Sequence, residues 1–376
     1  MSYFIIPKKH TGIKLNPTFS KNKNTPIISF SLQHYINDVK KQIENIPQSE
    51  EDDYSIEFIS KTVNPYEYIF SNVPGSKFSV GKIKPKSEIF YSLMEIVHTF
   101  YLFEPFNEVN IKTIHFGQNT ESTIECINIL REEYEDVNLN FTLEHPEING
   151  FKIIPGVDKM SIDFLFFELN QETYMNTDYY VVGLIVILCN ILYYQCLKGI
   201  SIIKFDNIYD SPTLDIIYIL SSMYEKVYII KPNASNIGNN ERYIVCKNFI
   251  LDYTKILEYT KSLDILKTAI KKYIDFEQRI SINSLIELEL PYYFLNKIEE
   301  SNIIIGHQQI EYYDQIISII KNKNRDDKIE TFKKNNIQKC IQWCEKHKIP
   351  YNKFIDKVNI FLPYISSSDE VEVDVK

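Results

Sequence analysis

From residue 111 onward the chain alternates short apolar runs with segments of helical periodicity, and this alternation constrains the fold more than any other feature. Strands separated by helices run parallel, because each helix carries the chain back to the start of the next strand. We therefore expect an α/β domain with a parallel, doubly wound sheet. The expected strands are Ile111–Phe116, Val137–Leu143, Ile162–Phe167, Ile200–Phe205, Lys226–Ile230 and Arg242–Phe249. The expected helices among them are Ser122–Tyr134, Tyr179–Leu197 and Pro212–Tyr224.

The last two strands are joined differently from the others. Residues 231–240 form a polar loop without helical periodicity. Two strands that lack a crossover helix are expected to pair antiparallel. We therefore predict a parallel sheet that is finished by an antiparallel edge strand.

The segments on either side of this unit lack its alternation of strands and helices. We predict an N-terminal arm with one helix over residues 1–60 and the sheet domain over residues 61–250. Within this domain a helix is expected at Ser87–Phe103, before the first strand. A helical extension follows over residues 251–365, and an acidic tail over residues 366–376. The helices expected in the extension are Ile256–Tyr273, Ser281–Lys297, Gln308–Lys321 and Ile337–Lys348.

Glycine is scarce, and this excludes several nucleotide-binding loops. The chain has 10 glycines, whereas average usage predicts about 26 in this length. No two glycines are adjacent or separated by a single residue, which excludes G-x-G-x-x-G loops of the dinucleotide-binding or kinase type. Residues 75–82 approach a Walker A loop, but the glycines are one residue too far apart and Ile83 replaces the hydroxyl that binds Mg²⁺.

Charge and cysteine usage indicate the environment of the chain. The net charge of −9 argues against unspecific attraction to nucleic acid, which needs clustered basic residues. Lysines that crowd residues 8–23 and 321–334 leave a local basic face as an open alternative to solvated charge. The six cysteines lie mostly in apolar runs without framework spacing, which favours reduced thiols in a reducing compartment.

Two features resemble a membrane span and a metal site. Tyr179–Leu197 is uncharged over 19 residues, but it contains Asn190 and Gln195 and lies between strands, so we expect a buried core helix and no membrane. Cys340, Cys344 and His347 share one face of a predicted helix without a fourth ligand. We expect that face to pack against the core, and we predict no metal site.

Two segments have sequences that are specific enough to compare with a known family. "KGISIIKFD" at residues 198–206 and "YILSSMYEKVYIIKPNASNIGNNERYIVCKNF" at residues 218–249 resemble the FtsJ-like (RrmJ-type) ribose 2′-O-methyltransferases, particularly those of large cytoplasmic DNA viruses. The resemblance extends from Val63 to Phe354 and is weaker toward both ends. It implies the class I, Rossmann-like methyltransferase sheet with its antiparallel last strand, RNA as the substrate and S-adenosylmethionine as the methyl donor.

The resemblance also implies a Lys-Asp-Lys-Glu tetrad. A ribose hydroxyl is a poor nucleophile, so a lysine must hold and polarise it while carboxylates keep that lysine charged and aimed. The second lysine falls on Lys204 and the glutamate on Glu241. The first lysine falls on Ser92 and the aspartate on Glu168, so two positions depart from the family. Three lysines remain open as spatial substitutes for the first one: Lys82, Lys84 and Lys86.

The loop that would hold the methyl donor departs further. The family has a pattern such as "HLAEGPGGFIEAI", in which glycines let the backbone approach the donor closely. In this chain the three glycines and the proline of that pattern are replaced by Asn119, Thr120, Glu121 and Ser122. The "GG" of the second donor loop, after the catalytic strand, has become Leu169-Asn170. We therefore expect that the chain binds no cofactor. If the chain is an active methyltransferase instead, the expected cofactor is S-adenosylmethionine. The residues of the degenerate first loop are Gly117, Asn119, Thr120, Glu121 and Ser122.

These departures favour a methyltransferase fold without methyl transfer. By analogy with the methyltransferase-like small subunit of the poxvirus capping enzyme, we expect a regulatory or binding subunit of a viral mRNA-capping assembly. Its partner would be a capping-enzyme subunit, with RNA as a further open partner, in the host cytoplasm or the virion. The alternative is an active RNA 2′-O-methyltransferase that uses Lys204, Glu168 and Glu241. A third reading is a structural virion protein that reuses the fold.

Overall fold

The computed structural model describes most of the chain. It covers residues 2–8, 13–46, 54–74, 78–143, 151–169, 177–206, 208–250, 256–276, 280–322 and 325–352. Asn170 and the acidic segment 366–376, which the sequence singled out, lie outside the described residues.

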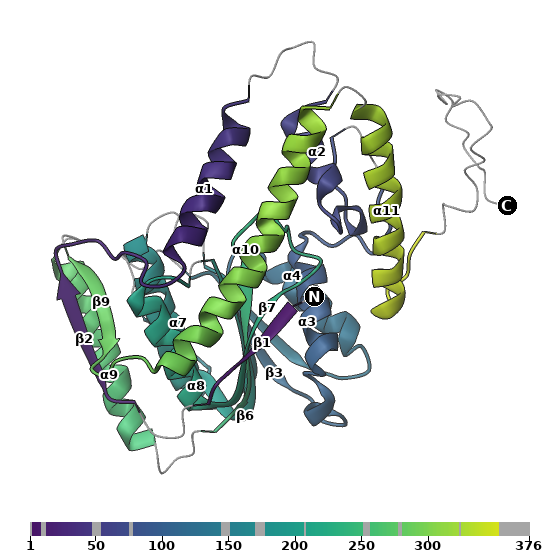
Figure 1. Cartoon of the computed structure of the whole chain (residues 1–376). Helices are drawn as coiled ribbons and strands as arrows, with labels where there is room; N and C mark the ends of the chain where they lie inside the picture. Colours follow the sequence, from purple (N-terminus) through teal and green to yellow (C-terminus); the bar gives the residue numbers. More distant parts are fainter. Residues whose placement is uncertain are drawn as a thin grey trace.

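A seven-stranded sheet forms the centre of the molecule, in the order β1-β7-β8-β6-β5-β3-β4 (Figure 1). Strands β4, β3, β5 and β6 are mutually parallel, while β8 runs antiparallel to both of its neighbours, β6 and β7. The mixed α/β architecture and the antiparallel last strand are confirmed. The strands are β1 (Ser2–Ile6), β3 (Lys112–Phe116), β4 (Val137–Phe141), β5 (Ile162–Phe167), β6 (Gln195–Phe205), β7 (Tyr224–Lys231) and β8 (Arg242–Phe249).

The position of the antiparallel strand was predicted wrongly. β8 lies inside the sheet, and the edge beyond β7 is taken by β1 from the N-terminal segment. That segment was expected to be an arm with one helix. The apolar run Ser2–Ile6 was too short to be recognised without its partner β7, which lies more than 220 residues further along the chain.

Helices cover both faces of the sheet, because residues along each strand alternate between two buried surfaces. In β5, Phe164 and Phe166 face α3 and α4, whereas Leu165 and Phe167 face α7 and α8. By length and composition alone α7 could cross a membrane. Most of it is buried in the core, as predicted. These helices are α3 (Ile89–Phe100), α4 (Thr120–Leu130), α7 (Thr177–Tyr194) and α8 (Ser211–Met223), with short 3₁₀ turns at Glu67–Ile69 and Glu104–Phe106.

A group of helices from both ends of the chain lies above the sheet in Figure 1. Their apolar faces form a third buried cluster, in which Ile36 and Val39 of α1 meet Tyr312 and Ile316 of α10. The longest helix, α10, therefore connects this cluster to the face of the sheet. The helices are α1 (Phe30–Glu44), α2 (Ile56–Val63), α10 (Tyr292–Ile320) and α11 (Arg325–Lys346).

The helix predicted over Ser281–Lys297 is wrong. β9 (Ser281–Ile286) is a strand that pairs antiparallel with β2 (Leu15–Ser20), and α10 begins only after Pro291. Apolar residues at 282, 285 and 286 fit a helical period as well as a short strand. The tertiary structure selects the strand, because the Asp215 carboxylate of α8 accepts hydrogen bonds from the Leu285 amide and the Ser284 hydroxyl.

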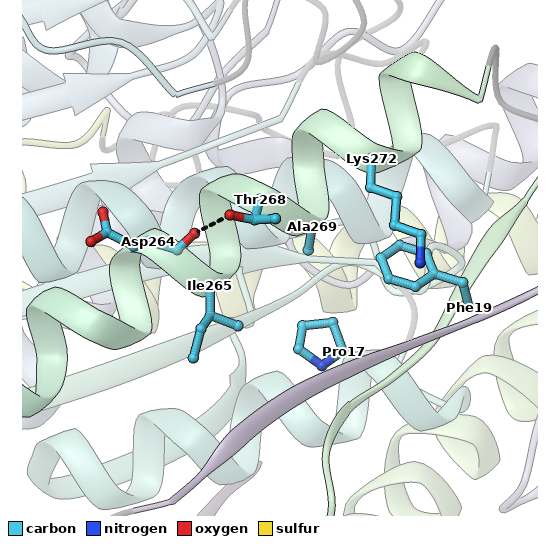
Figure 2. Close-up of a pocket in the computed structure, with 7 residues that line it drawn as sticks. All are labelled: Pro17, Phe19, Asp264, Ile265, Thr268, Ala269 and Lys272. Carbon is cyan, nitrogen blue, oxygen red and sulfur yellow. Dashed lines mark hydrogen bonds between the residues drawn. The ribbon is translucent and has the colours of Figure 1, made fainter.

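The two-stranded unit packs on α9 (Ile256–Asp275), and a pocket of about 370 Å³ opens between β2 and this helix. Figure 2 shows Pro17 and Phe19 of β2 opposite Ile265 and Ala269 of α9, with Lys272 above the Phe19 ring. The Lys272 ammonium lies 4.1 Å from the centre of that ring, a cation–π contact that ties the helix to the strand. The division of the chain into the four predicted segments stays a prediction, although β1 and β9 show that the flanking segments are not purely helical.

Candidate functional site

Three charged residues meet where parallel strands β5 and β6 end. Glu168 directly follows β5, Lys204 is the second-last residue of β6, and Glu241 directly precedes β8. The sheet brings them together because Phe167 pairs with Ile203, and Lys204 pairs with Tyr243 of the antiparallel strand. In open α/β sheets, sites form at the carboxyl ends of the strands, so this is the edge at which chemistry is expected.

The lysine is held between the two carboxylates. Lys204 Nζ lies 3.0 Å from Glu168 Oε1 and 3.3 Å from Glu241 Oε2. The side chains of the three residues are 19%, 7% and 18% exposed, so the cluster is largely buried yet Lys204 can be reached from solvent. Glu168 stands where the family tetrad has an aspartate, which is a departure from the family pattern. Its carboxylate nevertheless contacts Lys204 from this position. We refer to Glu168, Lys204 and Glu241 as the charged triad.

Lys204 and Glu241 are ionised at neutral pH. Burial alone would lower the pKa of Lys204, but the charges of Glu241 and Glu168 outweigh it and hold the pKa well above its usual value. Burial would likewise raise the pKa of Glu241, yet Lys204 and Lys231 lower it, and the Tyr243 hydroxyl donates a hydrogen bond to this carboxylate. A lysine that stays protonated is not a general base. It can hold an oxygen ligand and stabilise charge on it.

The loop after β3 approaches the triad through Gly117 and Asn119. Gly117 has φ +145°, and a Cβ at this position would lie 2.9 Å from both Cβ and the carbonyl oxygen of Glu168, so only glycine fits. Asn119 stands at the N-cap of α4 but does not cap the helix with its side chain. Its amide instead donates to Glu168 Oε2 at 3.1 Å. Both oxygens of Glu168 are thus engaged, one by Lys204 and one by Asn119.

The other residues of this loop differ in direction. Thr120 and Ser122 are buried, at 8% and 1% exposure. Glu121 faces outward and forms an ion pair with Lys86. Of the four residues that replace the glycines and proline of the family pattern, one crosses to the end of β5, two are buried and one points to solvent.

The fourth position of the tetrad supplies no cation. Ser92 is buried within α3 at 2% exposure. Lys86 pairs with Glu121 rather than with a member of the charged triad, and Lys82 and Lys84 are exposed on the same segment. The structure therefore brings together three of the four residues singled out for the tetrad, and their role in catalysis stays a prediction.

Comparison with known proteins supports an assignment of the fold. Residues 103–249 match the model of the FtsJ-like methyltransferase family. The chain carries an FtsJ-like methyltransferase fold. The matched segment begins just after α3 and ends with β8, so it contains Glu168, Lys204, Glu241 and the loop after β3.

Curated relatives are named as cap-specific mRNA (nucleoside-2′-O-)-methyltransferases. Protein 1A of Caenorhabditis briggsae is 26% identical over 38% of this chain and 17% of its own length. Protein 1 of Drosophila melanogaster is 26% identical over 43% of this chain and 21% of its own. Protein 1B of C. briggsae, which is 24% identical over 46% of this chain and 20% of its own, is named inactive. The chain thus spans only about a fifth of the length of these relatives.

One solved structure, named as a ribosomal RNA methyltransferase from Plasmodium falciparum, aligns with 44% of this chain and with all of its own. The TM-score is 0.33 and the sequence identity is 16%. The assignment of the fold rests on the strand order and the family match rather than on this similarity.

Sequence reasoning missed the residues that hold Glu241 of the FtsJ-like fold in place. Lys231, buried at the end of β7, donates hydrogen bonds to the carbonyl oxygens of Asn236 and Asn239 in the loop before Glu241. Burial lowers its pKa to about 7 despite the neighbouring charge of Glu241. The available signal was a charged residue that follows the apolar run Val227–Ile230 and directly precedes proline.

Two helices secure the same loop. The Glu95 carboxylate of α3 accepts a hydrogen bond from the Ala234 amide, and the Tyr313 hydroxyl of α10 donates to the Gly238 carbonyl at 2.6 Å. Arg242, which is fully buried, donates to Asn302 of α10. α3 and the C-terminal helix α10 therefore position Glu241, a role that local sequence patterns do not reveal.

The cysteine face of α11 lies apart from the charged triad. Cys340 and Cys344 are buried with Trp343, which contacts Tyr91 edge-on, and His347 stacks on His98 of α3. Within the described part of the chain, no three His, Cys, Asp or Glu side chains are grouped to hold a metal ion. The face packs α11 against α3 of the FtsJ-like fold.

Proposed function

We propose that this chain is a catalytically degenerate FtsJ-like protein that serves as a regulatory or binding subunit of a viral mRNA-capping assembly. The observation that carries the proposal is the hydrogen bond from Asn119 to Glu168. In the family, the loop after the first strand presents bare backbone to the methyl donor. In this chain a side chain extends from that loop to the end of β5.

The chemistry of transfer explains why this matters. A methyl group moves in line from a sulfonium to the ribose oxygen, so donor and acceptor must meet beside the lysine that holds the acceptor. Glu168 and Asn119 are bonded to each other on that side of Lys204. The buried Thr120 and Ser122 add further bulk to the loop. These residues do not fit a closely bound methyl donor.

The names of the relatives support the choice of assembly. All three are named as cap-specific mRNA (nucleoside-2′-O-)-methyltransferases, and one of these names adds that the protein is inactive. A chain that keeps the fold but not the donor site retains a rigid platform for binding a protein or RNA. By analogy of fold alone, we assign a capping-enzyme subunit as its protein partner, in the cytoplasm of an infected host cell.

A second function is favoured by the charged triad. Lys204 is fixed between Glu168 and Glu241, as an active 2′-O-methyltransferase would require. In this reading Lys204 holds the ribose hydroxyl of a capped RNA, the two glutamates keep it charged and aimed, and S-adenosylmethionine supplies the methyl group. The missing cation at Ser92 and the Asn119 contact place this reading second.

Calorimetric titration with S-adenosylmethionine tests the proposal. We expect no saturation up to about 1 mM, which corresponds to a binding free energy weaker than about 4 kcal/mol, while an active FtsJ-like enzyme that is titrated alongside should saturate. We also expect no transfer of labelled methyl to capped RNA. Micromolar binding together with transfer that is abolished by Lys204→Ala would establish the second function instead.

The partner is tested separately. The proposal expects the full chain to copurify with a subunit of a capping enzyme and to stimulate guanine-N7 methylation by that subunit. If copurification fails and the chain is found as an abundant protein of purified virions, a structural role replaces the regulatory one.

A further inference from the structure

β1 is an edge strand whose outer side is open. One side of the strand pairs with β7 from Ser2↔Lys231 to Ile6↔Val227. Among the residues that the structure describes, no strand pairs with the other side, since β1 stands first in the strand order. The outward N–H and C=O groups of an edge strand are a template for another strand.

The residues of β1 do not protect this edge. Natural edge strands are usually blunted by lysine, proline, a bulge or a covering segment. Ser2-Tyr3-Phe4-Ile5-Ile6 contains no charge and no proline, and its pairing with β7 has no irregularity. The opposite edge strand, β4, is instead interrupted by two asparagines, Asn138 and Asn140.

Both faces of β1 are apolar, and only one of them is covered. Phe4 and Ile6 are buried toward α10, whereas Tyr3 and Ile5 are 51% and 54% exposed on the opposite face. Tyr3 contacts the rings of Phe100 and Tyr228 edge-on. The exposed apolar surface on this face therefore borders directly on the free strand edge.

The other face is bordered by a charged strip of α10. Lys297 lies over the Phe4 ring, 6.0 Å from its centre, and forms an ion pair with Glu300 at 2.7 Å. By helical spacing Tyr293 and Ile304 share this face of α10, and both are exposed. A positive and a negative charge thus stand one turn apart on α10, with the lysine beside Phe4 of β1.

We propose that the occupant of this edge is β1 of a second copy of the chain, which pairs antiparallel about a twofold axis. With Phe4 opposite Phe4, Tyr3 of each copy faces Ile5 of the other on the exposed side, which forms an apolar aromatic–aliphatic row. The same axis reverses the two α10 helices, so that Lys297 of one copy faces Glu300 of the other. The interface is self-complementary in backbone, apolar surface and charge, as a twofold contact requires.

Sedimentation velocity of the full chain over about 1–100 µM tests this inference, which does not depend on the proposed function. We expect a concentration-dependent dimer. Ile5→Lys should weaken it at least tenfold, because two lysines would lie diagonally on the same face without a counter-ion. Val137→Lys is the matched control, since Val137 is 49% exposed on the opposite edge strand β4. This variant should dimerise like the wild type.

Three results would overturn the inference. The first is a chain that stays monomeric up to the highest concentration, which would leave the edge to a strand of a different protein. The second is a dimer that Ile5→Lys does not weaken. The third is a dimer that Val137→Lys weakens equally, which would place the contact elsewhere. Unchanged melting temperatures of both variants would show that the comparison concerns association and not folding.

Discussion

Replacing Lys204 with methionine is expected to lower the free energy of unfolding by about 3–5 kcal/mol, the usual loss when one partner of a buried ion pair is removed. Methionine keeps much of the length and apolar surface of the side chain. It leaves the carboxylates of Glu168 and Glu241 without their shared cation in a place where solvent reaches them poorly. Urea denaturation at pH 7 measures the loss.

Lys226→Met is the matched control for this prediction. Lys226 is exposed on β7, where a surface substitution should change the free energy of unfolding by no more than about 0.5 kcal/mol. If Lys204→Met is as mild as this control, the triad does not contribute to stability as its geometry indicates. A loss that the added change Glu241→Gln partly restores would show that the stranded carboxylate causes it.

The contribution of the triad should also depend on pH. The pKa of Glu241 is lowered in the folded protein, so its share of the stability is complete above the ordinary glutamate pKa of about 4.3 and is lost as the pH falls through the lowered value. In Lys204→Met the burial of Glu241 is no longer offset by the lysine, so its pKa is higher than in the wild type. The difference in stability between the two proteins should therefore shrink as the pH falls from this higher value through the lowered wild-type value.

His115 is expected to make the chain less stable in mild acid, at a pH well above the lowered pKa of Glu241. This side chain is fully buried in β3, between the hydroxyls of Thr113 and Thr123, and burial lowers its pKa to about 3. The unfolded chain takes up a proton at about pH 6.5, whereas the folded chain does not. Between these two values the free energy of unfolding should fall by about 1.4 kcal/mol per pH unit from this residue alone.

The variant His115→Gln isolates this effect. Glutamine retains groups that can form hydrogen bonds with the two threonines, but it does not titrate. Between pH 6.5 and 5 the free energy of unfolding should therefore change less steeply with pH than in the wild type, by the equivalent of about one bound proton. His347, whose burial and neighbouring charges lower its pKa to about 4, remains in both proteins and contributes equally. Urea denaturation at half-unit pH steps provides the comparison. Parallel curves for the two proteins would contradict the assignment.

Much of the central domain followed from local patterns. Short apolar runs predicted β3, β5, β7 and β8 to within about two residues, and the polar loop 231–240 predicted that the last two strands pair antiparallel. Pro212 marked the start of α8. These features depend on residues close together in the sequence, so they can be predicted from a single sequence.

The flanking segments were harder to predict, because their structure depends on distant partners. β1 requires β7, and β9 requires both β2 and the carboxylate of Asp215. The apolar spacing of residues 281–286 fits a helix and a strand equally well, so no local rule selects one of them.

For the site, the sequence by itself determined the charged residues and the strand ends that carry them, since Lys204 and Glu241 were identified from motif letters alone. Only the tertiary structure decided that Glu168 reaches Lys204 and that Asn119 bonds Glu168 rather than capping α4. It also decided that α3 and α10 hold the loop before Glu241. The physical reason is range: periodicity and capping act over a few residues, whereas these contacts join atoms between 36 and 139 residues apart in the chain.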